Sequence, residues 1–162
     1  MTTNEETLEV LRGILKNAKV AMLVTISDDQ RLVARPMQLQ DVEYDGDLWF
    51  LTRTDTDKYE EIKTNDNVNV VIADKSYASL SGKAEIIDDV EKKKEFWSKA
   101  YELMFDLDYT DPRITLIKVH TETAEYWDTS STIKSAYNFI KKVVGKEEPV
   151  KPGKSTNETL EL

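Results

Sequence analysis

Residues 77–87 alternate between small or apolar side chains and polar ones, and this pattern constrains the fold more than any other in the chain. The apolar or small positions are Ala78, Leu80, Gly82, Ala84 and Ile86. A period of two places one set of side chains on each face of a β-strand. The segment therefore predicts a long strand with one buried face, in a protein built around a sheet.

The rest of the chain supplies enough strands for a barrel. Five further segments are expected to be strands: 20–26, 31–44, 48–52, 68–73 and 115–127. Apolar residues at helical spacing predict helices over 4–18, 57–63, 90–105 and 133–144. Short connections between successive strands favour antiparallel pairing, and six strands can close or nearly close a barrel. We expect a mainly β fold with flanking helices.

Local motifs predict how some of these elements begin and end. Asp45-Gly46 predicts a tight hairpin between strands 31–44 and 48–52, because Asp-Gly suits the positive φ angles of a primed turn. Two helix starts pair an aspartate with a glutamate three residues later, Asp57 with Glu60 and Asp88 with Glu91. Each pair fits an aspartate version of the capping box.

The domain organisation is simple. Residues 1–145 are expected to form one domain, and 146–162 a polar, mobile tail with two prolines. The chain lacks an apolar run long enough for a membrane span, and its first residues do not resemble a signal peptide. It contains no cysteine, which excludes disulfides and thiolate sites and favours a cytoplasmic location.

Charge and histidine content exclude several functions. The formal net charge is −9, whereas a protein that neutralises nucleic-acid phosphates or binds an anionic membrane needs a basic face. His120 is the only histidine, so a transition-metal site is not expected. We read His120 as an exposed strand residue. Neither nucleic acid, membrane nor metal is therefore an expected partner.

The segment 48–62, LWFLTRTDTDKYEEI, joins a strand to a helix and permits two interpretations. Thr54, Thr56 or Asp57 can simply cap the helix. Alternatively the helix N-terminus, the Thr52 hydroxyl and the Lys58 ammonium form an anion site, because unpaired amides there suit a phosphate. Carboxylates at the same terminus compete for those amides, so the residues alone favour the cap.

Three further motifs carry weak signals of a bound ring. Pro36, in Arg35-Pro36-Met37, places a kink in a strand, which frees backbone groups to bind the edge of a planar ring. Gly82 permits close approach of a ligand or of another backbone, or marks a bend that closes a barrel. Trp127 ends the last strand, where it can cap a core or wall a cofactor pocket.

Taken in order, these motifs resemble one family. The set comprises Arg35-Pro36-Met37, Trp49-Phe50-Leu51-Thr52, Lys58, Ser81-Gly82-Lys83-Ala84-Glu85 and Glu125-Tyr126-Trp127. It is similar to the FMN-binding split β-barrel of the pyridoxamine 5′-phosphate oxidase-like proteins, in the general stress protein branch. The resemblance covers roughly residues 5–145 and implies a six-stranded antiparallel split barrel. It also implies a homodimer with flavin sites at the subunit interface.

The resemblance assigns roles to particular residues. One strand segment would lie along the isoalloxazine ring and ribityl chain of the flavin: Arg35, Pro36, Met37 and Gln38. The next residues at the site would be Leu51 and Thr52, at the end of a second strand. Lys58 would bind the FMN phosphate, and Trp127 would lie near the ring, from either subunit. The same phosphate anchor would also suit FAD or a deazaflavin.

Two departures from the family pattern bear on function. Asp57 stands where the family commonly has a phosphate-binding arginine, so FMN should bind more weakly unless Arg35 or Arg53 compensates. The segment 128–133 lacks the arginine and histidine that grip the substrate of true pyridoxamine phosphate oxidases, so vitamin B6 oxidation is not expected. Three alternatives remain: a flavin-dependent oxidoreductase of unknown substrate, a non-catalytic flavin-storage or sensing protein, and a cofactor-free structural dimer.

Overall fold

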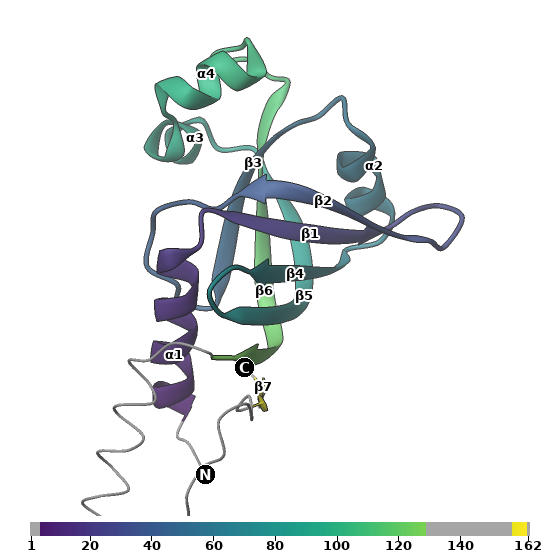
Figure 1. Cartoon of the computed structure of the whole chain (residues 1–162). Coiled ribbons are helices and arrows are strands. Elements are labelled where there is room, and N and C mark those ends of the chain that lie inside the picture. The colour runs from purple at the N-terminus through teal and green to yellow at the C-terminus, as the bar shows by residue number, and fades with distance from the viewer. Residues whose placement is uncertain (1–3, 129–156, 162) are drawn as a thin grey trace, which may run out of the picture.

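The computed structural model describes residues 4–128 and 157–161 as one curled sheet with helices around it (Figure 1). The strands are β1 (Val20–Ile26), β2 (Leu32–Gln38), β3 (Asp47–Arg53), β4 (Asn67–Ala73), β5 (Tyr77–Ile87), β6 (Ile114–Trp127) and β7 (Asn157–Glu161). The helices are α1 (Asn4–Asn17), α2 (Asp57–Thr64), α3 (Val90–Phe96) and α4 (Lys99–Phe105). Among the described residues, no helix is long and apolar enough to cross a membrane.

The sheet confirms the expected split barrel. Its strand order is β2-β1-β4-β5-β6-β3, and every pairing along this path is antiparallel. β2 and β3 are therefore the two edges, and the curl of the sheet brings them toward each other (Figure 1). β7 pairs with the last residues of β6, outside this path.

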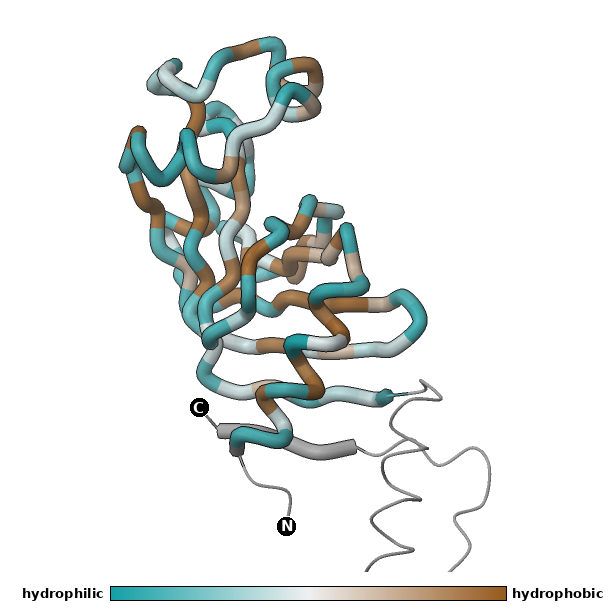
Figure 2. Tube along the Cα trace, turned by 90° about the vertical axis from the view of Figure 1, so that its left-hand side faces the viewer, coloured by the Kyte–Doolittle hydropathy of each residue, from teal (hydrophilic) through white to brown (hydrophobic). Residues whose placement is uncertain are grey.

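The barrel interior holds the main hydrophobic core. The alternation of β5 is realised, because Ala78, Leu80 and Ala84 are buried while Tyr77 and Ser81 are exposed. Along the tube in Figure 2, apolar and hydrophilic residues alternate on the strands, as a sheet with one covered face requires. α1 covers one end of the barrel with three buried apolar residues, Leu11, Ile14 and Leu15, and Ala18 is buried directly after it.

A second cluster lies on the outer side of β3 and β6, beneath α3 and α4. Its buried members are Leu51, Phe96, Tyr101, Ile114 and Leu116. The ring of Trp97 stacks on the rings of Tyr101 and Phe105, with centroids 5.8 and 6.0 Å apart. Successive residues of β3 thus face different cores: Leu51 lies beneath α3 and α4, and the Thr52 side chain faces the barrel interior.

The expected hairpin between β2 and β3 does not form. The chain does turn at Asp45-Gly46, where Gly46 has a φ of 113° and the Asp45 carboxylate accepts a hydrogen bond from the Asp47 amide. However, β2 already ends at Gln38, and β3 pairs only with β6. The turn instead aligns β3 with β6, because the Thr121 amide donates to the Gly46 carbonyl.

The single helix expected over 90–105 is two helices. Trp97 adopts an extended conformation (φ −71°, ψ 139°) that ends α3, and Ser98 begins α4. The break turns Phe96 toward Trp49, while Trp97 packs against α4. Tyr101 of α4 is buried, whereas Met104 on the same helix is 59 % exposed.

The expected caps also differ. Asp89, not Asp88, caps α3 by accepting a hydrogen bond from the Lys92 amide at 3.1 Å. The Asp88 carboxylate lies instead 3.5 Å from the buried ammonium of Lys93.

The C-terminal predictions are only partly covered by the structure. The helix expected over 133–144 and the boundary between domain and tail at 145–146 lie outside the described residues. Within the segment expected to be a polar tail, the structure describes β7 paired with β6, an element that the sequence pattern did not indicate.

Gly82 has a structural explanation. The register between β5 and β6 shifts between Ser81 and Gly82, so the two backbones come unusually close. An added Cβ at Gly82 would overlap the carbonyl group of His120. The approaching group is therefore the β6 backbone, and the glycine carries no signal of a ligand.

Candidate functional site

The first part of the site is a polar network between β1, β2 and α2. Arg35 donates to the Thr25 hydroxyl at 2.5 Å and to the Glu61 carboxylate at 3.1 Å. Thr25 in turn donates to the same Glu61 carboxylate. The Arg35 and Glu61 side chains are only 19 % and 13 % exposed, so the guanidinium is held in one orientation.

Lys58 supplies a second cation beside this network. Its side chain is partly buried, and burial lowers the pKa of its ammonium, with the nearby charge of Arg35 as the second cause. Lys58 has no ion pair with any residue in 4–128 that the structure describes. Among the described residues, Glu61 pairs with Arg35 only, while Lys58 feels the charges of Asp55 and Asp57 without an ion pair to either. Two neighbouring cations of this kind favour an added anion.

The N-terminus of α2 lacks a side-chain cap. The N-cap residue is Thr56, and its hydroxyl donates to the Arg53 carbonyl at 2.8 Å instead of accepting from the first helical turn. The prediction that Asp57 caps this helix is therefore wrong, because Asp57 is already its first helical residue. The Tyr59 amide donates to the Thr56 carbonyl at 3.2 Å, so the earlier amides of this turn are the ones open to water or to a ligand.

Arg53 cannot compensate for the aspartate at position 57. Its guanidinium is bound by the Asp55 carboxylate through contacts of 2.8 and 2.5 Å. The same contact lowers the pKa of Asp55 and raises that of Arg53. Arg35 is thus the cation that the fold places beside Lys58.

Thr52 adds a buried hydroxyl on the barrel side of β3. Its side chain is 1 % exposed, and the hydroxyl has no hydrogen-bond partner in the part of the chain that the structure describes. A buried hydroxyl without a partner is costly unless something binds it. The chemistry of the Thr52, Lys58 and Arg35 side chains fits a phosphate monoester.

The other residues predicted to bind the cofactor do not all lie beside the polar network. Arg35 and Met37 face the barrel interior, whereas Pro36 and Gln38 lie exposed on the outer face of β2. Leu51 belongs to the cluster beneath α3 and α4.

Trp127 lies farther away still. It is the last residue of β6, a strand of 14 residues whose other end pairs with β3. At about 3.3 Å per residue, that strand spans roughly 45 Å. Trp127 therefore lies toward the end of β6 opposite to the one that pairs with Thr52.

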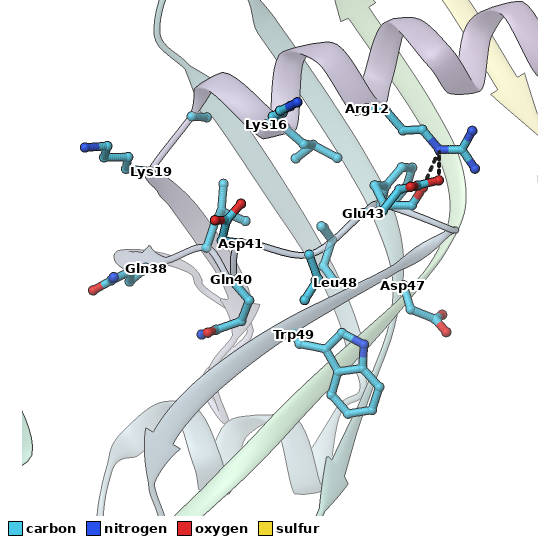
Figure 3. A pocket seen from close by; sticks show the side chains of 15 residues that line it. Arg12, Lys16, Lys19, Gln38, Gln40, Asp41, Glu43, Asp47, Leu48 and Trp49 are labelled. Atoms are coloured by element: carbon cyan, nitrogen blue, oxygen red, sulfur yellow. Dashed lines mark hydrogen bonds and ion pairs between the residues drawn. The ribbon is translucent and has the colours of Figure 1, made fainter. Parts of the chain in front are cut away.

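A cavity opens where β2 ends. It has a volume of about 600 Å³ and lies between α1, the loop after β2 and the start of β3 (Figure 3). Its labelled lining residues are Arg12, Lys16, Lys19, Gln38, Gln40, Asp41, Glu43, Asp47, Leu48 and Trp49. Gln38 stands three residues after Arg35, roughly 10 Å along β2, so the cavity and the polar network are separate features of the same strand.

His120 is exposed, as expected, but it has a partner that the sequence did not indicate. Its Nδ1 lies 2.8 Å from the Asp47 carboxylate on the neighbouring strand β3. In the described part of the chain, no group of three or more acidic, histidine or cysteine side chains could hold a metal ion.

The sequence pattern missed two members of the network, Thr25 and Glu61. Thr25 is a polar residue at an inward position of an otherwise apolar strand, and it is fully buried. Glu61 stands three residues after Lys58 on α2, where helical spacing places both on one face. The inward position of Thr25 and the spacing of Glu61 can both be read from the sequence, but neither shows that the two residues contact Arg35.

A comparison with known protein families identifies the family of this chain. The model of the family described as pyridoxamine 5′-phosphate oxidase like matches residues 6–150. The chain belongs to this family. The family generally binds flavin.

Curated relatives point to the general stress protein branch. The chain is 31 % identical over 77 residues to general stress protein 26 of Bacillus subtilis, covering 44 % of this chain and 54 % of that protein. It is 27 % identical over 135 residues to the protein bli-3 of Neurospora crassa, covering 75 % of this chain and 65 % of that protein. The matches thus span less than two thirds of both relatives.

Solved structures agree on the fold. The chain is similar to general stress protein 26 of Bacillus anthracis, with a TM-score of 0.67, 26 % identity and coverage of 74 % and 92 % of the two chains. It is also similar to a Clostridium acetobutylicum protein related to general stress protein 26, with a TM-score of 0.68, 22 % identity and coverage of 78 % and 92 %.

Proposed function

We propose that the protein binds FMN, with the phosphate held between Arg35 and Lys58 at the N-terminus of α2, and acts as a flavin-dependent oxidoreductase of the general stress protein type. The observation that carries this proposal is the pair of cations beside an uncapped helix N-terminus, in a member of a flavin-binding family. FAD or a deazaflavin would present the same phosphate chemistry.

The proposed division of labour is simple. When bound, the flavin supplies hydride or electron transfer, and the protein supplies binding, orientation and electrostatics. Arg35 and Lys58 neutralise the phosphate, and the Thr52 hydroxyl offers a hydrogen bond at the barrel wall. The cavity at Gln38 provides room for the substrate.

The proposed site needs a second copy of the chain. Trp127 lies toward the far end of β6 from Thr52, which supports an approach to the flavin from a partner subunit. We therefore propose a homodimer with flavin sites at the interface. The cysteine-free chain is also proposed to work in the cytoplasm.

The outer face of β1 and β2 suits such an interface. We call it the outer β1–β2 face; its residues are Val20, Met22, Val24, Ile26, Leu32, Ala34, Pro36 and Gln38. All but Gln38 are apolar, and Leu32 and Val20 are 76 % and 54 % exposed. An exposed apolar face of this kind is typical of a protein–protein interface.

A second candidate is a non-catalytic protein that stores or senses flavin. The observation in its favour is that segment 128–133, which follows the last strand of the barrel, has no arginine or histidine to grip a substrate phosphate. Turnover of reduced nicotinamide with an artificial acceptor separates the two candidates. A rate no higher than that of free FMN would favour storage or sensing.

The first experiment on the proposed function is an absorption spectrum of the purified protein after incubation with FMN and removal of the excess. Flavin bands that remain with the protein are expected. Riboflavin, which lacks the phosphate, is the matched ligand and should be retained much less. A protein that retains neither ligand would contradict the proposed function and leave the barrel as a structural module.

A further inference from the structure

The proposed phosphate site contains its own anion. Glu61 contacts Arg35 at 3.1 Å and accepts a hydrogen bond from Thr25, and its side chain is only 13 % exposed. The Glu61 carboxylate therefore occupies part of the guanidinium that a phosphate would need. Asp57, the departure seen in the sequence, is exposed and has no ion pair with any residue in 4–128 that the structure describes, although its charge acts on Lys58.

The charges of the site explain what Glu61 does to a ligand. Arg35 and Lys58 contribute two positive charges, and Glu61 removes one of them. An FMN phosphate carries nearly two negative charges at neutral pH. Repulsion between partly buried charges is weakly screened, so a carboxylate in contact with Arg35 opposes phosphate binding more than an exposed one does.

The same carboxylate has a favourable effect on the free protein. Without it, two cations would lie together in a partly buried site, which is costly. Through Thr25 and Arg35, Glu61 also ties α2 to β1 and β2. The residue thus stabilises the empty site and opposes the filled one.

We propose that Glu61 is the residue that sets the affinity and phosphate selectivity of this site, by competing with the ligand phosphate for the Arg35 guanidinium. The proposal rests on the proposed function, because it assumes that the phosphate binds at Arg35 and Lys58. It assigns the larger part of the weakening of FMN binding to Glu61, because Glu61 is partly buried in contact with Arg35, whereas Asp57 is exposed and acts on Lys58 only at a distance.

The test is Glu61→Gln in the full chain, with FMN and riboflavin titrations followed by flavin fluorescence. Glutamine keeps the length of the side chain and an acceptor oxygen for Thr25 and Arg35, and removes only the charge. We expect FMN to bind about 10-fold more tightly and riboflavin to bind as before. Glu61→Ala removes the same charge and gives the same direction if the glutamine variant fails to fold.

Glu60→Gln is the matched control. It makes the same charge change at the adjacent, exposed position of the same helix. Its effect on FMN affinity should be less than about 2-fold, because an exposed charge is strongly screened. An equal gain from Glu60→Gln would overturn the proposal in favour of a general charge effect.

Lys58→Ala separates failure of this inference from failure of the proposed function. If Lys58→Ala leaves FMN affinity unchanged, the phosphate does not bind here and both proposals fall. If Lys58→Ala weakens FMN binding but Glu61→Gln does not strengthen it, only the role of Glu61 is overturned.

Discussion

The backbone of Gly82 packs directly against the carbonyl group of His120 on the neighbouring strand. An added Cβ would lie 2.8 Å from the His120 carbonyl carbon and 3.0 Å from the Cα of Thr121. These are backbone atoms, so they cannot move away without breaking the pairing of the neighbouring strands β5 and β6.

Gly82→Ala should therefore be strongly destabilising, by about 3 kcal/mol or more. Chemical denaturation followed by circular dichroism measures the change. Gly13→Ala is the matched control, because nothing lies within 4 Å of a Cβ at this helical position. It should stabilise the protein by up to about 1 kcal/mol. Equal stabilities of the two variants would contradict the packing described for Gly82.

Lys93 gives a second prediction about stability. The residue is 1 % exposed, and its ammonium donates to the Ile114 carbonyl at 2.9 Å. Lys93→Ala leaves that buried carbonyl without its donor and removes a long, packed side chain. We expect a loss of about 2–3 kcal/mol in unfolding free energy, measured by denaturation. Lys94→Ala, an exposed neighbour in the same helix, should change stability by less than about 0.5 kcal/mol.

The pair of Asp111 and Arg113 predicts a particular pH dependence. Arg113 donates to the Asp111 carboxylate at 2.9 and 3.0 Å, which lowers the pKa of Asp111 to about 2. A pKa depressed on folding contributes stability above the unfolded value of about 3.9, and this contribution is lost as the pH falls toward 2.

Asp111→Asn should flatten the stability profile in that window. Denaturation between about pH 4 and 2 should show that the variant takes up fewer protons on unfolding, by up to about one. Arg113→Gln should flatten the profile similarly, because Asp111 then titrates near its ordinary value. A profile for Asp111→Asn that runs parallel to that of the natural chain would show that the pair does not act in this way.

The outer β1–β2 face predicts the oligomeric state. Met22 is 37 % exposed at the middle of this face, opposite Pro36 on β2 and Val71 on β4. Met22→Asp would bury a charge in the proposed interface, so light scattering should show a monomer where the natural chain is a dimer. We expect the dimer dissociation constant to rise at least about 100-fold.

Leu103→Asp is the control for that experiment. Leu103 is 77 % exposed on α4, away from the outer β1–β2 face, so this variant should remain a dimer. A natural chain that is monomeric at all concentrations would contradict the proposed interface. It would also remove Trp127 from the flavin site.

Individual residues show how far the candidate site was predictable. Arg35, Lys58 and Thr52 were expected from motif order, and the structure places Lys58 near Arg35 and leaves the Thr52 hydroxyl without a partner among the described residues. Thr25 and Glu61 were missed, because their contacts join positions far apart in the sequence. Met37 on β2 is buried in the barrel core, and Leu51 on β3 is buried in the cluster beneath α3 and α4. The sequence did not show this, because side chains alternate along each strand and only the packed sheet shows what covers each face.

The sequence by itself determined six of the seven described strands and the inner face of β5, since the period of two along 77–87 already decides which of its side chains are buried. It also determined the antiparallel pairing, because short connections allow little else. Only the tertiary structure decided that β3 pairs with β6 and not with β2, and that Arg35 meets Glu61. Local signals describe turns and periods, whereas the choice of a distant partner depends on the packing of the whole barrel, which no short segment encodes.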